Sequence, residues 1–161
     1  MKIGVLHKAN DPRIAIAPAI IADFAKAEHT VLVQADQDSF FSGKDFQALE
    51  IELVKAAEML QQVDVLVSTG CPSDEILQQN SRKTPLICAL SIEDEERLRT
   101  SFDFPCLNLY RIPRTTIAQA IDIRSSMASL AGYQAVIEAA QYLPGYFPMM
   151  MTAAGTIPPA K

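Results

Sequence analysis

The chain has 161 residues, of which 49% are hydrophobic and 20% charged, and its formal net charge at pH 7 is −5. This length is typical of one domain with a substantial core, and an acidic chain without a basic cluster does not favour nucleic acid or an anionic membrane surface. No apolar run approaches the ~20 residues of a membrane helix, and the apolar N-terminus is too short for a signal peptide. We therefore expect a cytoplasmic protein that does not itself insert into the membrane.

Apolar runs alternate with helix-forming segments along the first two thirds of the chain. Strands are predicted at residues 2–7, 30–34, 63–68, 85–90 and 106–110. Helices are predicted at residues 19–27, 44–50, 56–62, 73–79 and 91–98, with a polar loop at 36–43. Continuous apolar strands separated by helices indicate an α/β fold, a doubly wound parallel sheet of the flavodoxin-like or Rossmann-like kind, with both faces covered.

The three cysteines are Cys71, Cys88 and Cys106. Their number is odd and no two are close in the sequence, so neither a disulfide framework nor a zinc site is predicted, and we expect no metal. Cys88 and Cys106 lie in apolar runs, which is typical of buried free thiols.

A long helix is predicted at residues 122–143, and it is rich in small residues. Its polar stripe is thin and consists of Gln134, Glu138 and Gln141. A helix that is apolar on nearly every side should be buried on nearly every side. It either packs between the sheet and another domain or is a core helix of this domain alone. We predict a domain at 1–143 and a linker at 144–161, which holds four of the ten prolines.

The best candidate site follows the last predicted strand, where ligand sites of α/β proteins tend to lie. It contains Arg114, Gln119 and Asp122. A glutamine amide can match a carboxamide or a ribose hydroxyl, and an arginine offers a planar array of donors. Asp122 can pair with Arg114 or cap the following helix. Spacing alone favours a purely structural Arg–Asp pair, because such pairs are common where a loop enters a helix.

Residues 114–122 form the pattern Arg-x4-Gln-x2-Asp, which is followed by Ser125-Ser126-Met127 and Ala131-Gly132-Tyr133. With the ending at 149–161, this stretch resembles the NAD(H)-binding component of the proton-translocating NAD(P) transhydrogenase alpha subunit. The resemblance implies the N-terminal domain of a two-domain dehydrogenase, with 144–161 leading towards a Rossmann NAD-binding domain. None of the six glycines forms a Gly-x-Gly pair, so the sequence lacks the turn that binds a pyrophosphate.

In that family, the matching Arg, Gln and Asp form a loop beside the nicotinamide rings. The resemblance therefore implies catalytic and cofactor-binding roles for Arg114, Gln119 and Asp122, and a supporting contact to the cofactor from Ser125. It implies Re/Si-specific hydride transfer from NADH to NADP⁺, coupled to proton translocation, with NAD(H) as cofactor and NADP(H) on a partner component. This chain alone is expected to be inactive and to bind NAD(H) poorly.

The same resemblance implies partners. We expect NADP(H)-binding and membrane subunits, a homodimer, and a location peripheral to the inner membrane through those subunits.

Two alternatives remain. Residues 11–18 resemble the Arg-Val-Ala-x-Thr-Pro motif shared with alanine dehydrogenases, in which the arginine, here Arg13, binds the substrate carboxylate. However, that family's lysine near residue 67 is absent, and residues 87–91 contain no histidine. Without them no proton-transfer group for an amino acid is evident, which favours a structural Arg13 and speaks against an alanine dehydrogenase-like oxidoreductase. The other alternative is a non-catalytic assembly domain.

Overall fold

The computed structural model describes residues 1–35 and 39–160, which form two compact units, Met1–Ile112 and Pro113–Lys161. Residues 36–38 of the predicted loop and Lys161 of the predicted linker lie outside the described residues. The predicted domain boundary at residue 143 remains a prediction.

The first unit is built around six strands. These are β1 (Lys2–Leu6), β2 (Thr30–Gln34), β3 (Glu52–Val54), β4 (Val65–Ser68), β5 (Leu86–Cys88) and β6 (Cys106–Asn108). The helices are α1 (Pro18–Lys26), α2 (Gly43–Gln47), α3 (Ala56–Met59), α4 (Asp74–Gln78), α5 (Ile92–Ser101) and the 3₁₀ turn η1 (Leu109–Arg111). The five predicted strands and five predicted helices are therefore confirmed, with shorter bounds in most cases, whereas β3 was not predicted.

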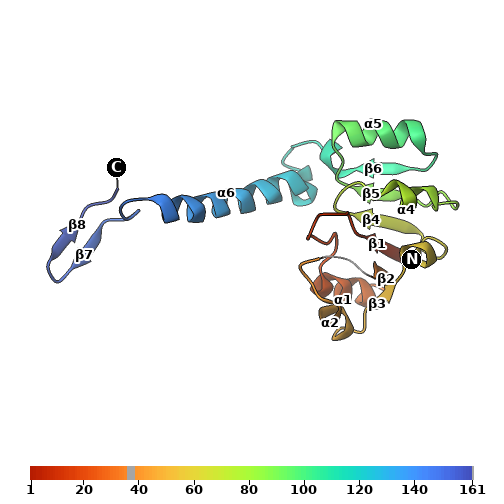
Figure 1. Cartoon of the computed structure of the whole chain (residues 1–161), viewed down its shortest axis with the longest axis horizontal. Coiled ribbons are helices and arrows are strands. Elements are labelled where there is room, and N and C mark those ends of the chain that lie inside the picture. The colour runs from red at the N-terminus through yellow and green to blue at the C-terminus, as the bar shows by residue number, and fades with distance from the viewer. Residues whose placement is uncertain (36–38, 161) are drawn as a thin grey trace. The chain divides into compact units, whose positions relative to one another are not determined.

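All strands of this sheet are parallel, in the order β3-β2-β1-β4-β5-β6 (Figure 1). The order runs outward in both directions from β1 and β4, which is the Rossmann arrangement rather than the flavodoxin one. The predicted doubly wound α/β fold is confirmed.

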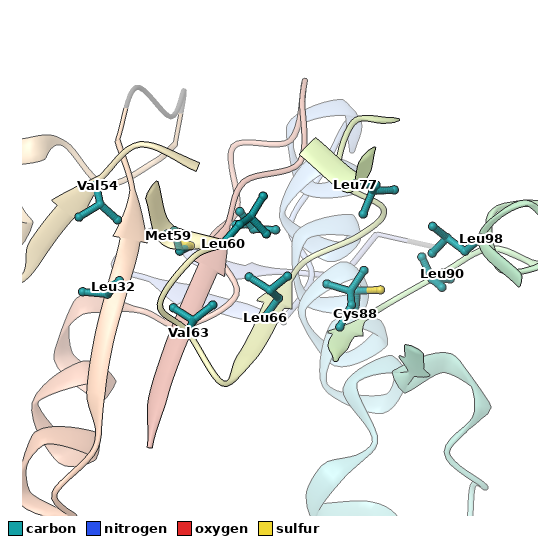
Figure 2. Close-up of a cluster of buried hydrophobic side chains, with 12 residues drawn as sticks. Leu32, Val54, Met59, Leu60, Val63, Leu66, Leu77, Cys88, Leu90 and Leu98 are labelled. Atoms are coloured by element: carbon teal, nitrogen blue, oxygen red, sulfur yellow. The ribbon is translucent and has the colours of Figure 1, made fainter. Parts of the chain in front are cut away.

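Alternate residues of the strands contribute to two hydrophobic cores, one on each face of the sheet, because successive side chains of a strand point to opposite faces. One core packs on α3, α4 and α5, and Figure 2 shows its buried side chains. Its buried members are Leu6, Leu32, Val54, Met59, Leu60, Val63, Leu66, Leu77, Leu86, Cys88, Leu90 and Leu98. The other packs on α1 and α2 and consists of Ile3, Val5, Ile21, Val31, Val33, Phe46 and Ile51. The two apolar layers fix the sheet between its helices.

Helix α5 begins where the sequence predicts. The Ser91 side chain accepts a hydrogen bond from the Asp94 backbone amide at 3.1 Å. This contact satisfies one of the unpaired donors of the first turn.

The cysteine prediction needs a correction. Cys88 is buried as expected, but Cys106 is exposed, because it lies on the edge strand β6. The two cysteines are also close in space, with their sulfur atoms 3.9 Å apart. Sequence distance hid this contact, since parallel pairing brings β5 and β6 together across an intervening helix.

The second unit contains the 3₁₀ turn η2 (Ala118–Ile121), α6 (Ile123–Tyr142), β7 (Met150–Thr152) and β8 (Gly155–Ile157). The long helix is confirmed, but none of its residues is buried, so the expected burial on nearly every side is wrong for this chain by itself and α6 is not a core helix of this domain alone. The predicted linker contains an antiparallel hairpin of β7 and β8. No helix of the described part of the chain is long and apolar enough to cross a membrane.

Candidate functional site

The four residues singled out from the sequence lie together at the start of the second unit. They line a hollow of about 270 Å³ whose lining residues all have polar side chains. Its lining consists of Arg114, Thr115, Thr116, Gln119, Asp122 and Ser125. The segment is exposed apart from the buried Asp122 and a few half-buried positions, as expected for a ligand-accessible loop.

Asp122 fixes the start of α6. Its Oδ1 atom accepts hydrogen bonds from the backbone amides of Arg124 at 3.0 Å and Ser125 at 3.4 Å. The carboxylate therefore caps the helix and lies at the positive end of the helix dipole. The sequence left open whether Asp122 caps the helix or pairs with Arg114, and the structure shows both.

The second carboxylate oxygen organises the polar groups that face the hollow. Asp122 Oδ2 accepts a hydrogen bond from the Ser125 hydroxyl at 2.7 Å and lies 3.5 Å from Arg114 Nε. Arg114 Nη2 in turn donates to the Ser125 oxygen at 3.3 Å. Three side chains thus form a closed triangle. An arginine with two anchored contacts presents its remaining donors in a defined direction.

The Asp122 carboxylate in this triangle is ionised at neutral pH. The hydrogen bond from the Ser125 hydroxyl is the largest cause that holds the pKa of Asp122 below its usual value. The backbone amides of Ser125 and Arg124 and the charge of Arg114 act in the same direction, against the effect of burial. A group of this kind orients its neighbours and does not supply a proton near pH 7.

Gln119 reaches the hollow from η2. Its side chain is exposed, and its amide makes no hydrogen bond to any described residue. The turn that carries it is held by Thr115, whose hydroxyl oxygen accepts a hydrogen bond from the Ala118 amide at 3.3 Å. Thr115 and Thr116 were not predicted from the sequence as site residues. Their only signal was their position directly after Arg114.

Arg13 belongs to a separate arrangement in the first unit. Its Nε and Nη2 atoms donate to the two carboxylate oxygens of Asp11 at 2.8 and 2.7 Å. The Asp11 side chain is only 7% exposed and also accepts a hydrogen bond from the Thr69 hydroxyl at 3.2 Å. The hydrogen bond from Arg13 is the main reason that the pKa of Asp11 lies far below its usual range. This bidentate pair supports the structural interpretation of Arg13.

A sequence model of the family described as "Alanine dehydrogenase/PNT, N-terminal domain" matches residues 7–131, which is most of the chain. The chain belongs to this family. The match covers the Arg13 loop, strands β2 to β6 of the parallel sheet and the segment that lines the polar hollow.

The chain is similar to named alpha subunits of NAD(P) transhydrogenases. The NAD(P) transhydrogenase subunit alpha of Haemophilus influenzae is 33% identical over the whole chain, which spans 33% of that protein. The NAD(P) transhydrogenase subunit alpha of Cereibacter sphaeroides is 30% identical over the whole chain, which spans 32% of it. These relatives are thus transhydrogenase alpha subunits, and the chain covers about a third of their length.

Solved structures agree with this assignment. The crystal structure of transhydrogenase from Sinorhizobium meliloti superposes with a TM-score of 0.81 at 28% identity, over 99% of this chain and 50% of that one. An L-alanine dehydrogenase superposes with a TM-score of 0.56 at 18% identity, over 70% of this chain and 33% of that one. The second likeness shows a shared fold alone.

Proposed function

We propose that this chain is the N-terminal region of an NAD(P) transhydrogenase alpha subunit and that residues 114–125 contact the nicotinamide end of NADH. Membership of the family and the names of the relatives support the first half. The polar hollow supports the second.

The single observation that best supports the proposed site is the Gln119 amide, which makes no hydrogen bond to any described residue and lines the same hollow as the anchored Arg114. A carboxamide is both a donor and an acceptor, and the Gln119 amide is its complementary partner. Ser125 and Arg114 add a hydroxyl and guanidinium donors at the same hollow. This donor set fits the carboxamide and ribose hydroxyls of a nicotinamide nucleotide. The proposal places the pyrophosphate outside this chain, and the lack of a Gly-x-Gly pair in the sequence supports this.

In the proposed mechanism, these residues orient the nicotinamide end of the cofactor. The bound nicotinamide nucleotide supplies the hydride chemistry itself. Gln119 and Arg114 hold the reacting end in place, and Asp122 keeps Arg114 in position through the triangle with Ser125. Holding two reactants at near-attack distance can remove a large share of the activation barrier to hydride transfer. No side chain has to accept a proton in the hydride step, which agrees with an ionised Asp122.

The second nucleotide, NADP(H), is assigned to a partner component. Helix α6 supports the expected self-association, because apolar side chains along it remain exposed. Four of them follow one another at helical spacing: Leu130, Tyr133, Val136 and Ile137. An apolar surface of this kind marks a protein contact, and we assign it to a homodimer. The proposal also includes peripheral attachment to the inner membrane through the membrane subunit. It further includes proton translocation and Re/Si specificity of the assembled enzyme.

One assay separates the candidate functions. The assembled enzyme that contains this chain is given NADH and an NADP⁺ analogue in one reaction, and NAD⁺ with alanine in another. Reduction of the NADP⁺ analogue supports the proposal. Oxidation of alanine would establish the alanine dehydrogenase alternative, and the absence of both activities would leave an assembly role.

A further inference from the structure

Two thiols lie side by side on neighbouring strands, outside the proposed cofactor site. Leu86 pairs with Cys106 and Cys88 pairs with Asn108 in the register of β5 and β6. Cys88 and Cys106 are therefore offset by two residues on the same face of the sheet, and their sulfur atoms are 3.9 Å apart.

The two thiols differ in access to solvent. Cys88 is fully buried in the core that packs on α3, α4 and α5 (Figure 2). Cys106 is exposed on β6, at the edge of the sheet, and borders a hollow of about 150 Å³ beside Glu95 and Phe104. A small reagent can therefore reach Cys106, whose sulfur lies 3.9 Å from the sulfur of the buried Cys88.

We propose that Cys88 and Cys106 form an oxidation site that closes into a reversible disulfide when the protein meets a hydroperoxide. The Cys106 thiolate attacks the peroxide oxygen, the O–O bond breaks, and a sulfenic acid and hydroxide are formed. The Cys88 thiol then attacks the Cys106 sulfur and loses its proton, and the sulfenic oxygen leaves as water. Two thiols are oxidised and one hydrogen peroxide is reduced to two waters in total.

Electrostatics favour this order of events. A hydrogen bond from the Cys88 thiol lowers the pKa of Cys106, and the same contact together with burial raises the pKa of Cys88. The exposed sulfur is thus the one that becomes a nucleophilic thiolate, while the buried sulfur keeps its proton until the second step.

The register predicts that the bond is easily reversed. Diagonal neighbours on a sheet face have Cα atoms roughly 7–8 Å apart, whereas a disulfide prefers about 4.4–6.8 Å. Closure must therefore draw β6 towards β5. β6 can move because it has three residues and pairs with β5 alone among the described strands. A bond formed at the cost of such a shift is readily reduced.

The third cysteine provides a matched control. Cys71 is half-buried, and its sulfur accepts a hydrogen bond from Arg97 Nη2 at 3.1 Å. Burial raises its pKa above the ordinary value. Cys71 is therefore expected to take no part in the reaction.

The test is thiol counting and peptide mapping of the folded protein after mild treatment with hydrogen peroxide. Thiols titrated after unfolding should fall from three to one. Proteolysis should yield a linked pair of peptides that contain residues 88 and 106, and dithiothreitol should restore all three thiols. Cys71→Ser should still form the link, whereas Cys88→Ser and Cys106→Ser should not.

Other products would overturn the proposal. These are a sulfinic acid on Cys106 with Cys88 still reduced, a disulfide that includes Cys71, a dimer linked through Cys106, or no loss of thiols. If a serine variant fails to fold, the peptide map of the unsubstituted protein gives the same decision.

Discussion

Gln119→Asn is the substitution that most sharply separates orientation of the cofactor from binding of the cofactor. It retains the amide but shortens the side chain by one carbon–carbon bond, which is about 1.5 Å. The Gln119 amide makes no hydrogen bond to any described residue and the side chain is exposed, so the change breaks no hydrogen bond within the described chain. The stability of the protein should therefore be unchanged.

The expected loss is in the rate of hydride transfer. Displacement of a reacting group by ~1 Å can cost ~10²-fold in rate. This factor corresponds to about 2.7 kcal/mol of activation free energy. Loss or weakening of one hydrogen bond changes the binding free energy by only about 0.5–1.5 kcal/mol. We therefore expect a fall of roughly two orders of magnitude in rate, with a much smaller change in NADH affinity.

The assay is single-turnover hydride transfer from NADH to an NADP⁺ analogue in the assembled enzyme, followed by absorbance, with NADH affinity measured separately. Gln78→Asn is the matched control, because Gln78 is exposed on α4 in the other unit. An unchanged rate in Gln119→Asn would show that Gln119 does not lie at the reacting centre. A large loss of affinity with an unchanged rate would assign Gln119 to binding alone.

Three further substitutions test the cap of α6, the packing of the core and the Asp11–Arg13 pair. Asp122→Asn keeps a cap acceptor for the Ser125 amide but removes the charge that holds the arginine, so helical circular dichroism should persist while hydride transfer slows. Gly4→Ala brings a Cβ to 2.7 Å from Met59 Sδ in a packed core, and urea unfolding should show a loss of about 1–3 kcal/mol. Because the pKa of Asp11 is lowered by folding, its contribution to stability is present above about pH 3.9 and is lost as the pH falls. Asp11→Asn should flatten the acid side of the stability–pH curve, and a curve that matches the unsubstituted protein would contradict this.

The sequence was sufficient for most of the sheet and for the local geometry of the site. Continuous apolar runs identified β1, β2, β4 and β5, because strands of a covered parallel sheet lack polar alternation, and they also identified the edge strand β6, which is mostly exposed. The pairing of Asp122 with Arg114 and the capping of α6 by Asp122 were both raised as possibilities, because these residues lie close together in the sequence, whereas the contacts of Ser125 with Asp122 and Arg114 were not predicted. Helix capping then fixes their geometry with little tertiary information.

The features that the sequence missed depend on pairing between segments. β3 has three residues and begins with Glu52, so it carries too little apolar signal to be recognised alone. The hairpin of β7 and β8 turns through Ala153 and Ala154, without the Asn-Gly or Asp-Gly pair that usually marks such a turn. The contact between Cys88 and Cys106 is set by the register of β5 and β6, which no local pattern encodes.

The most direct test of the proposed site is the distance between the Gln119 side-chain amide and the nicotinamide carboxamide in a crystal structure with NADH bound. The proposal predicts a hydrogen bond of about 2.7–3.2 Å, with Arg114 or Ser125 also in contact with the same end of the cofactor. A nicotinamide that contacts none of Arg114, Gln119 and Ser125 would contradict the assignment of the site.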